Sequence, residues 1–241
     1  MRYGIFSDVH SNLEAFKVVS DYLKRSKLDR LIFIGDIIGY GPRPAECISL
    51  LRDINPVLVT GNHEWGILDK LALSYFNPDA RASLVWTRKQ ITSADIKYLS
   101  SFSLSYENEE LICVHGSLSK PDKFYYIASM HEAELSFSLM QHQICFVGHS
   151  HRAGIYSLSD GFVVSLNQRQ IDIEPEKKYI VNVGSVGQPR DMNNRASVCV
   201  YDSSAKTLRI DRLEYNLQAT ASEILKLNLP SALANRLYEG W

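Results

Sequence analysis

The sequence has no long apolar run, no excess of charge of either sign and no targeting pattern, and each absence excludes a class of protein. No apolar stretch approaches the roughly 18 residues that a membrane-spanning helix needs, and the N-terminus does not resemble a signal peptide. The first apolar stretch begins so close to Met1 that we expect no targeting segment. The net charge of −1 gives no general attraction for nucleic acid or an anionic membrane. We therefore expect a cytoplasmic protein that binds neither nucleic acid nor membranes. The sequence leaves open whether the protein forms a homo-oligomer.

Cysteine is scarce, and linker-like sequence is absent. The four cysteines form no CxxC pair, and two of them lie inside predicted buried strands: Cys47, Cys113, Cys145 and Cys199. This pattern is typical of reduced, structural thiols. The chain has no internal repeat, no low-complexity tract and no segment rich in proline, glycine and serine. Its 241 residues are 45% hydrophobic, which suffices for a large core, so we expect one domain over residues 1–241.

Five short apolar stretches are present, and each ends on side chains that can bind a metal. In the central one, residues 31–34 form a buried strand that runs through Gly35 into Asp36. The side chains at the five ends are Asp8, His10, Asp36, Asn62, His63, His115, His149 and His151. Sites in open α/β sheets form at the carboxyl ends of strands, so we expect these side chains to meet at one sheet edge.

The order of predicted elements indicates an α/β fold with two sheets. A first strand within residues 3–10, a second that ends at Asp36 and a third that runs to Asn62 alternate with helices over about 13–24 and 44–54, which is the pattern of a doubly wound sheet. Residues 64–102 read as helical, with a break at Asn77-Pro78 and a last helix capped at Ser93. A hairpin over 104–115, a long loop, a helix to about 139 and a strand that ends at His149 follow. Beyond His151, short strands predict a second, more antiparallel sheet that packs on the first. These strands are 154–158, 162–165, 179–183, 196–201 and 207–213, and helices over 217–227 and 231–238 close the chain.

The strand-end residues favour a metal site because of their joint pattern. A single aspartate after a strand is usually a turn residue, and a single buried histidine is usually a hydrogen-bonded core residue. Five of the seven histidines lie at strand ends, however, and two residues in each Asp-x-His or His-x-His pair can share a face. Carboxylate, imidazole and amide ligands together suit Mn²⁺, Fe²⁺ or Zn²⁺ and not a thiolate zinc site. The remaining histidines are expected to be solvated side chains: His131 and His142.

The motifs resemble those of a known family. Asp8-x-His10, Gly35-Asp36, Gly61-Asn62-His63-Glu64, a separate His115 and Gly148-His149-x-His151 occur in an order similar to that of the calcineurin-like metallophosphoesterase superfamily. The resemblance runs from the first strand to at least His151, and residues 182–190 are similar to a segment of its small prokaryotic members. It implies a four-layer α/β sandwich, with two packed mixed β-sheets flanked by helices, of the compact phosphodiesterase-like branch.

The resemblance also implies a site and a reaction. One divalent metal would be held by Asp8, His10, Asp36 and His151, and a second by Asp36, Asn62, His115 and His149. Asp36 would bridge two ions roughly 3.5–4 Å apart, with Mn²⁺ as the first choice and Fe, Zn, Ni or Mg as alternatives. A bridging hydroxide would then attack the phosphorus of a small soluble phosphate ester or nucleotide, so the protein is expected to be a hydrolase of phosphoric esters. Asn62 would also contact the substrate.

Three further residues are assigned through the same resemblance or through proximity to its motifs. His63 resembles the general acid of the family, and the alternative is a structural role behind the ligands. The branch that includes protein phosphatases carries an Arg-Gly pair after Gly-Asp, whereas this chain has residues 37–41 without arginine. Arg190 is a candidate phosphate anchor in its place, with a surface charge as the alternative. Tyr40 is a candidate substrate contact, with packing as the alternative. The other aromatic side chains near metal motifs are Trp65, Phe124, Tyr125 and Tyr126, of which the 124–126 loop is the better candidate.

Two other functions remain open from the sequence. The first is hydrolysis of diadenosine polyphosphates, which relatives of the protein-phosphatase branch carry out. The second is a scaffold without catalysis, as in the retromer subunit of this fold. The complete ligand set together with His63 argues against a scaffold.

Overall fold

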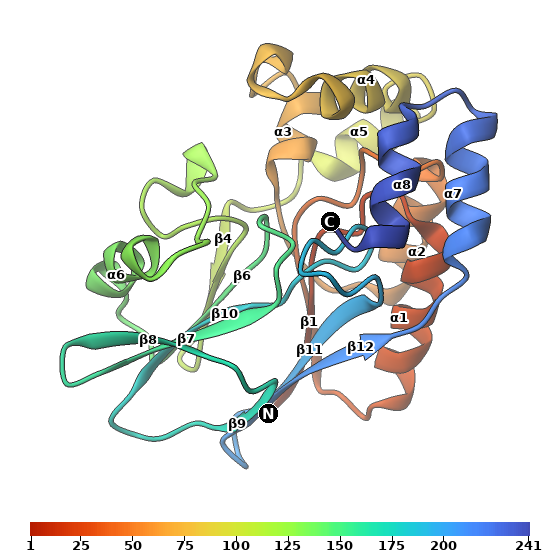
Figure 1. Cartoon of the computed structure of the whole chain (residues 1–241). Helices are drawn as coiled ribbons and strands as arrows, with labels where there is room; N and C mark the ends of the chain where they lie inside the picture. The colour runs from red at the N-terminus through yellow and green to blue at the C-terminus, as the bar shows by residue number, and fades with distance from the viewer.

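The computed structural model describes residues 1–241 and contains two six-stranded β-sheets packed face to face (Figure 1). The first sheet has the order β3 (Val57–Val59), β2 (Arg30–Ile34), β1 (Arg2–Phe6), β11 (Ala196–Asp202), β12 (Thr207–Leu213) and β9 (Gln170–Asp172). The second has the order β4 (Ser105–Glu107), β5 (Ile112–Val114), β6 (Ile144–Val147), β10 (Lys178–Asn182), β7 (Gly154–Ser159) and β8 (Phe162–Leu166). Both sheets are mixed, because β1–β3 and β5, β6 and β10 run parallel within an otherwise antiparallel arrangement.

Helices cover the two outer faces, which completes a four-layer sandwich as predicted. Those beside the first sheet are α1 (Leu13–Arg25), α2 (Pro44–Ile54), α7 (Leu217–Lys226) and α8 (Ser231–Glu239). The second sheet is covered by α6 (Met130–Leu139). Above the strand ends lie α3 (Asn62–Ile67), α4 (Pro78–Thr87) and α5 (Ser93–Leu99), with short 3₁₀ turns at Leu73–Tyr75 and Pro121–Lys123 (Figure 1). None of these helices is long and apolar enough to span a membrane.

The layers are held together by three apolar cores that follow from alternation along the strands. On β1, Phe6 points toward the helices and packs against Phe16 of α1, with ring centroids 5.6 Å apart. Its neighbours Tyr3 and Ile5 point the other way, into the core between the two sheets. A third, smaller core joins α6 to the second sheet. All four cysteines are buried and unpaired, which confirms the prediction of structural thiols.

Four details of the predicted fold differ from the structure. The strands β11 and β12 belong to the first sheet, because β1 pairs antiparallel with β11. The strands β5 and β6 belong to the second sheet, so the strand ends that carry the candidate ligands lie on two sheets and not on one edge. The cap of α5 is Thr92, whose side chain accepts from the Asp95 N–H while Asp95 accepts from the Thr92 N–H. The three-residue strand β9 has no counterpart in the prediction.

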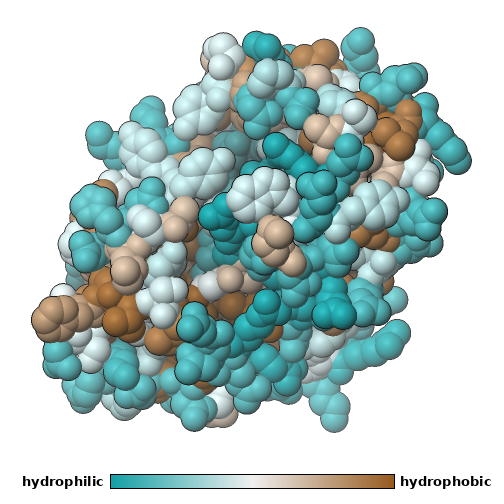
Figure 2. Space-filling model, viewed as in Figure 1, coloured by the Kyte–Doolittle hydropathy of each residue, from teal (hydrophilic) through white to brown (hydrophobic).

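Large apolar side chains are exposed on α6 and β8, away from the ligand-bearing turns. Figure 2 shows brown atoms gathered at the left of the view, over these two elements. The exposed side chains there include Met130, Leu135, Leu139, Phe162 and Val164.

Candidate metal centre

The eight candidate side chains converge where the carboxyl ends of the two sheets meet. Turns after β1, β2 and β3 bring them from the first sheet, and turns after β5 and β6 bring them from the second. All are buried, although each carries a polar or charged group. Donor atoms lie within 4.8 Å of one another in three overlapping groups: Asp8 with His10 and His151, His10 with Asp36 and His63, and Asp36 with His115 and His149.

The turns that carry these residues have a left-handed backbone that L-residues rarely adopt. The φ angles are 55° at Asp8, 48° at His10, 62° at Asp36, 63° at His149 and 60° at His151. Each such residue costs about 1–2 kcal/mol relative to the right-handed region. Strained non-glycine residues cluster at functional sites, where the surrounding structure holds them in place. Five of them around one point therefore indicate that the turns are shaped for a ligand.

Main-chain carbonyl groups orient three of the imidazole rings. Each ring is bonded through Nδ1: His10 to the Ile38 carbonyl at 3.0 Å, His115 to the Ile34 carbonyl at 2.7 Å and His151 to the Gln188 carbonyl at 2.5 Å. Because a carbonyl accepts only, Nδ1 must carry a proton, which leaves Nε2 as the nitrogen that can bind a metal when it is deprotonated. His149 is turned the other way, and its Nδ1 lies 3.2 Å from His115 Nε2.

Each of the two carboxylates is anchored by one oxygen and presents the other. Asp36 Oδ1 accepts from the His63 main-chain N–H at 2.9 Å, while Oδ2 lies 3.2 Å from His115 Nε2 and 3.7 Å from His10 Nε2. Asp8 Oδ2 accepts from the His149 main-chain N–H at 3.0 Å, while Oδ1 lies 3.3 Å from His151 Nε2. Asp36 Oδ2 thus lies between imidazoles of both predicted ligand sets.

The donor atoms fit divalent cations. Asp8 Oδ1 and Asn62 Oδ1 are buried and have no hydrogen-bond partner in the chain, which is rare for buried polar atoms. His10 Nε2 and His151 Nε2 face each other at 3.0 Å, so two lone pairs converge on one point. Oxygen and imidazole nitrogen donors without thiolate suit Mn²⁺, Fe²⁺ or Zn²⁺.

The two buried carboxylates of the site, Asp8 and Asp36, favour a positive charge beside them. Burial raises the pKa of Asp8 and Asp36, but the surrounding histidines outweigh burial and hold both pKa values below the usual range. Burial lowers the pKa of His115, and the Asp36 carboxylate raises it more strongly, to about 10. A proton on His115 thus supplies the positive charge that the carboxylates need. Metal binding must displace that proton, so affinity is expected to fall as pH decreases.

The carboxylate of Glu64 holds the ligand-bearing turns of β2 and β3 together. It is fully buried and accepts three main-chain hydrogen bonds, from Asp36 at 2.8 Å, Ile37 at 2.8 Å and Gly61 at 2.7 Å. Burial and the nearby Asp36 raise the pKa of Glu64 to about 7, against the effect of the N–H donors. A side chain at Gly61 would collide with Asp36 Oδ1, so the close approach of the two turns requires glycine there.

Replacing Glu64 with glutamine tests this clamp. One carboxylate oxygen becomes an NH₂ group that faces a main-chain N–H, so Glu64→Gln should lower the free energy of unfolding by about 1–3 kcal/mol. Metal affinity should fall by about 10–100-fold, because the turn that carries Asp36 loses its support. Urea unfolding and metal titration measure the two effects. The exposed Glu46 is the control, since Glu46→Gln should change stability by no more than about 0.5 kcal/mol; equal effects of both changes would contradict the clamp.

The segment after β10 fastens the turns of both sheets. Asn182 Nδ2 donates to the Gly148 carbonyl at 2.8 Å, while Ser185 Oγ and the Gly187 N–H donate to the Asp8 carbonyl at 2.7 and 2.9 Å. This is the segment that the sequence marked only by resemblance, and its structural part is to position the Asp8 and His149 turns.

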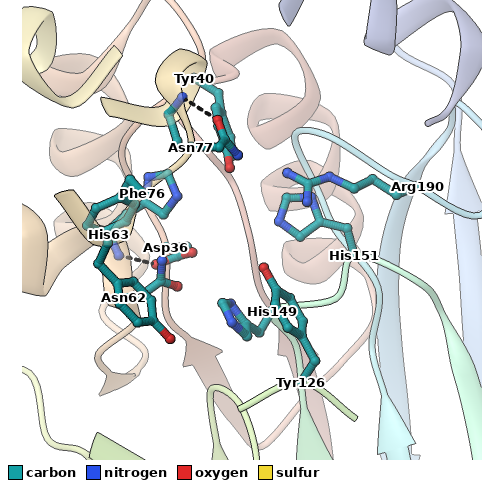
Figure 3. A pocket seen from close by; sticks show the side chains of 12 residues that line it. Asp36, Tyr40, Asn62, His63, Phe76, Asn77, Tyr126, His149, His151 and Arg190 are labelled. Atoms are coloured by element: carbon teal, nitrogen blue, oxygen red, sulfur yellow. Dashed lines mark hydrogen bonds between the residues drawn. The ribbon is translucent and has the colours of Figure 1, made fainter. Parts of the chain in front are cut away.

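A cavity of about 80 Å³ opens above the ligand groups (Figure 3). Its base is formed by Asp36, Asn62, His149 and His151. Both candidate substrate residues, Tyr40 and Arg190, line its walls. The sequence did not single out the other lining residues, which are Tyr75, Phe76, Asn77 and Ala80, and only the Asn77-Pro78 break marked this stretch.

The aromatic residues near the motifs occupy different environments. Tyr126 stacks on His149, with ring centroids 4.0 Å apart and an interplanar angle of 8°. Burial raises the pKa of Tyr126 to about 12, so its hydroxyl stays protonated. Phe124 is buried against Trp65, with centroids 5.0 Å apart, and Tyr125 is exposed. Of the 124–126 loop, only Tyr126 lines the cavity.

His63 occupies one wall of the cavity, in the first turn of α3. Its ring centroid lies 4.6 Å from that of His10, 4.7 Å from Tyr40 and 5.3 Å from Phe76. Its Nδ1 is buried without a hydrogen-bond partner. Burial holds the pKa of His63 well below its usual value. The ring is therefore neutral at pH 7 in the absence of a bound anion.

The two remaining histidines lie outside the site. His131 is exposed, as expected, and its side chain faces Glu134 at 3.8 Å. The expectation of a solvated His142 is wrong, since His142 is half-buried and its Nε2 bonds to the Asn108 carbonyl at 2.7 Å. This hydrogen bond fixes the end of the β4–β5 hairpin, and His142 takes no part in the candidate site.

Comparisons with known proteins agree with this geometry. The family model for the calcineurin-like phosphoesterase superfamily domain matches residues 1–206. The uncharacterized protein MJ0912 of Methanocaldococcus jannaschii is 35% identical over 241 residues, covering 98% of this chain and 97% of that protein. The chain therefore belongs to the calcineurin-like phosphoesterase superfamily, which confirms the resemblance drawn from the motifs.

Solved structures support the same fold. The crystal structure of a metallophosphoesterase from Sphaerobacter thermophilus is 34% identical, with a TM-score of 0.85 over 100% of this chain and 99% of that one. The hypothetical protein PH1004 from Pyrococcus horikoshii OT3 is 16% identical, with a TM-score of 0.81 over 100% and 98% of the two chains. At that identity, the second likeness concerns the fold alone.

Proposed function

We propose that the protein is a dinuclear metal-dependent phosphoesterase that hydrolyses small soluble phosphate esters or nucleotides. The observation that carries the proposal is the position of Asp36 Oδ2, which lies 3.2 Å from His115 Nε2 and 3.7 Å from His10 Nε2. One oxygen between two imidazoles of different ligand sets suits a bridge between two cations. The cavity directly above it gives a substrate access.

The ligand sets follow from the donor atoms on each side of this oxygen. One ion would be held by Asp8, His10, Asp36 and His151, and the other by Asp36, Asn62, His115 and His149. Mn²⁺ is our first choice, with Fe, Zn, Ni or Mg as alternatives. When bound, two such ions lower the pKa of a water molecule at the site and neutralise charge on phosphoryl oxygens.

Four residues of the chain would take part in binding the phosphate or in donating a proton to the leaving group. His63 on the wall of the cavity would deliver a proton to the leaving oxygen. The Asn62 amide would contact both a metal and the phosphate. Arg190 would bind phosphate oxygens, and Tyr40 would hold the guanidinium group, which lies 5.5 Å from the centre of its ring.

The two alternative functions are less well supported. The cavity has a volume of about 80 Å³, well below that of pockets that enclose a whole drug-sized ligand. A dinucleoside polyphosphate would therefore have to lie mostly outside it. A scaffold has no use for buried donor atoms such as Asp8 Oδ1 that lack a partner and cost stability.

Hydrolysis assays on metal-loaded protein test the proposal. Protein reconstituted with Mn²⁺ should hydrolyse p-nitrophenyl phosphate, its bis ester or both, and EDTA should abolish the activity. Dinucleoside polyphosphates should be poor substrates. Turnover of dinucleoside polyphosphates without turnover of either nitrophenyl ester would favour the first alternative. Metal-loaded protein without activity on any of these esters would contradict the proposed function.

A further inference from the structure

Two polar side chains outside the ligand sets reach into the cavity from the same side. Arg190 comes from the segment after β10, and Tyr126 comes from the loop before α6 (Figure 3). Both stand across the cavity from His63 and Phe76. Each also touches a different half of the ligand groups, because the Arg190 N–H bonds to the His151 carbonyl and Tyr126 stacks on His149.

The guanidinium group of Arg190 is held in place before any substrate binds. Its Nε and Nη2 donate to Gln188 Oε1 at 3.2 and 2.7 Å, and it lies over the ring of Tyr40. Gln188 is itself buried, and its carbonyl accepts from His151. Two of the five guanidinium N–H groups are thus used for positioning. Those on Nη1 have no partner in the chain and remain available for an anion.

The ring of Tyr126 is held by stacking on one side, although the residue is half-exposed. Parallel stacking on His149 at 4.0 Å fixes the plane of the phenol ring. The loop that carries it packs closely on Gly116, where a side chain would lie 2.7 Å from the Tyr125 carbonyl oxygen. The phenol therefore offers one neutral donor at the mouth of the cavity, beside the positive charge of Arg190.

We infer that Arg190 and Tyr126 bind the third non-bridging oxygen of a phosphoryl group, and that the protein consequently prefers phosphomonoester dianions to phosphodiesters. The inference rests on the proposed function. A monoester has three non-bridging oxygens, of which two would face the ligand groups at the base. The third would point away from the base, toward the donors on the wall. A diester carries an alkyl or aryl group at that position and one negative charge fewer.

The reaction then balances as simple hydrolysis. A water oxygen forms a bond to phosphorus, the bond between phosphorus and the leaving oxygen breaks, and the leaving oxygen takes up a proton. The products are inorganic phosphate and an alcohol. Because the cavity has a volume of only about 80 Å³, the remainder of the alcohol would extend out of it into solvent.

Two substrates with the same leaving group isolate the third oxygen. These are p-nitrophenyl phosphate and methyl p-nitrophenyl phosphate, which differ only by a methyl group on that oxygen. The native protein should prefer the monoester in kcat/KM by at least about tenfold. Arg190→Met should lower kcat/KM for the monoester by about 10–100-fold, mainly through KM, and Tyr126→Phe by about two- to tenfold. Both should change the rate with the methyl ester by less than about threefold.

A binding measurement and a control variant separate this effect from general damage. Calorimetry on metal-loaded protein should give weaker binding of inorganic phosphate in both variants, and unchanged binding of dimethyl phosphate. Tyr126→Phe keeps the stack on His149, so its metal content should stay native. Arg195→Met removes the same charge from an exposed position that pairs with Glu214, and should behave as the native protein.

The outcomes distinguish the two levels of the proposal. Hydrolysis of the methyl ester at a rate equal to or above that of the monoester would overturn the inference and leave the proposed function intact. Equal losses on both substrates in Arg190→Met and Tyr126→Phe would do the same. No hydrolysis of either substrate by metal-loaded protein would overturn both.

Discussion

Asp36→Asn is expected to remove both metal ions from the protein and to lower kcat/KM by at least about 10³-fold. The amide oxygen of asparagine can still accept from the His63 N–H, as Asp36 Oδ1 does at 2.9 Å. Its NH₂ group would then lie where Oδ2 now lies, between His115 and His10. A neutral donor at that point repels cations and offers no lone pair. Elemental analysis of the purified variant measures the loss of metal.

Asp8→Asn is the matched control for this change. The free oxygen of Asp8 lies 3.3 Å from His151 and 3.7 Å from His10, which belong to one ligand set, and farther, at 3.9 Å, from His115 of the other set. We therefore expect Asp8→Asn to weaken one ion and to retain the other. Two tightly held ions per chain in Asp36→Asn, or equal loss in both variants, would contradict the bridging role.

The second large effect concerns His63 and depends on the leaving group. His63→Asn should keep the metals, because the main-chain N–H that bonds to Asp36 is retained. It should lose about 10²–10⁴-fold in kcat with an alkyl or ribose leaving group, which needs a proton. With p-nitrophenolate, which leaves without a proton, the loss should be much smaller. Steady-state rates with both kinds of ester provide the measurement.

The protonation of His63 sharpens this test. Burial holds the pKa of His63 below its ordinary value, so the free protein carries a neutral ring at pH 7. A general acid needs the proton, and the negative charge of a bound phosphate is what would raise the pKa. Equal losses with both leaving groups and intact metal content would mean that His63 positions the substrate. Loss of metal from the His63→Asn variant would mean that His63 holds the metal ligands in position.

Much of the site could be predicted from the sequence because its signals are local. Short apolar runs that end at Gly35-Asp36 or Gly148-His149 identify buried strands, and a turn must follow each one. Parallel strands bring such turns to the same side of a sheet. We expected the residues that these turns carry to lie close together, and their donor atoms do fall into groups within 4.8 Å, although the turns come from two sheets.

The assignment of strands to sheets could not be predicted because it depends on long-range pairing. Alternation shows that β11 is buried, but not that Cys199 pairs with Ile5 of β1 across nearly the whole chain. Without that pairing, β11 and β12 appeared to continue the second sheet. The ligand-bearing strands were for the same reason placed on one edge, whereas the site lies between two sheets.

Sequence patterns also could not predict the residues that hold the site and the nearby hairpin in position. Gln188 binds Arg190 through its side chain and His151 through its carbonyl, and nothing in a single sequence marks a glutamine for that position. The same holds for His142, whose bond to the Asn108 carbonyl follows from the placement of a hairpin. Such residues act through tertiary contacts and have no local periodicity or motif.

The electron paramagnetic resonance spectrum of the protein loaded with two equivalents of Mn²⁺ tests the central claim most directly. Two Mn²⁺ ions bridged by the Asp36 carboxylate lie roughly 3.5–4 Å apart, which makes their spins couple. We predict a coupled, multiline spectrum that weakens in Asp36→Asn together with the metal content. Two bound ions that give only the six-line signal of isolated Mn²⁺, at an intensity equal to the total manganese, would contradict a dinuclear centre at this site.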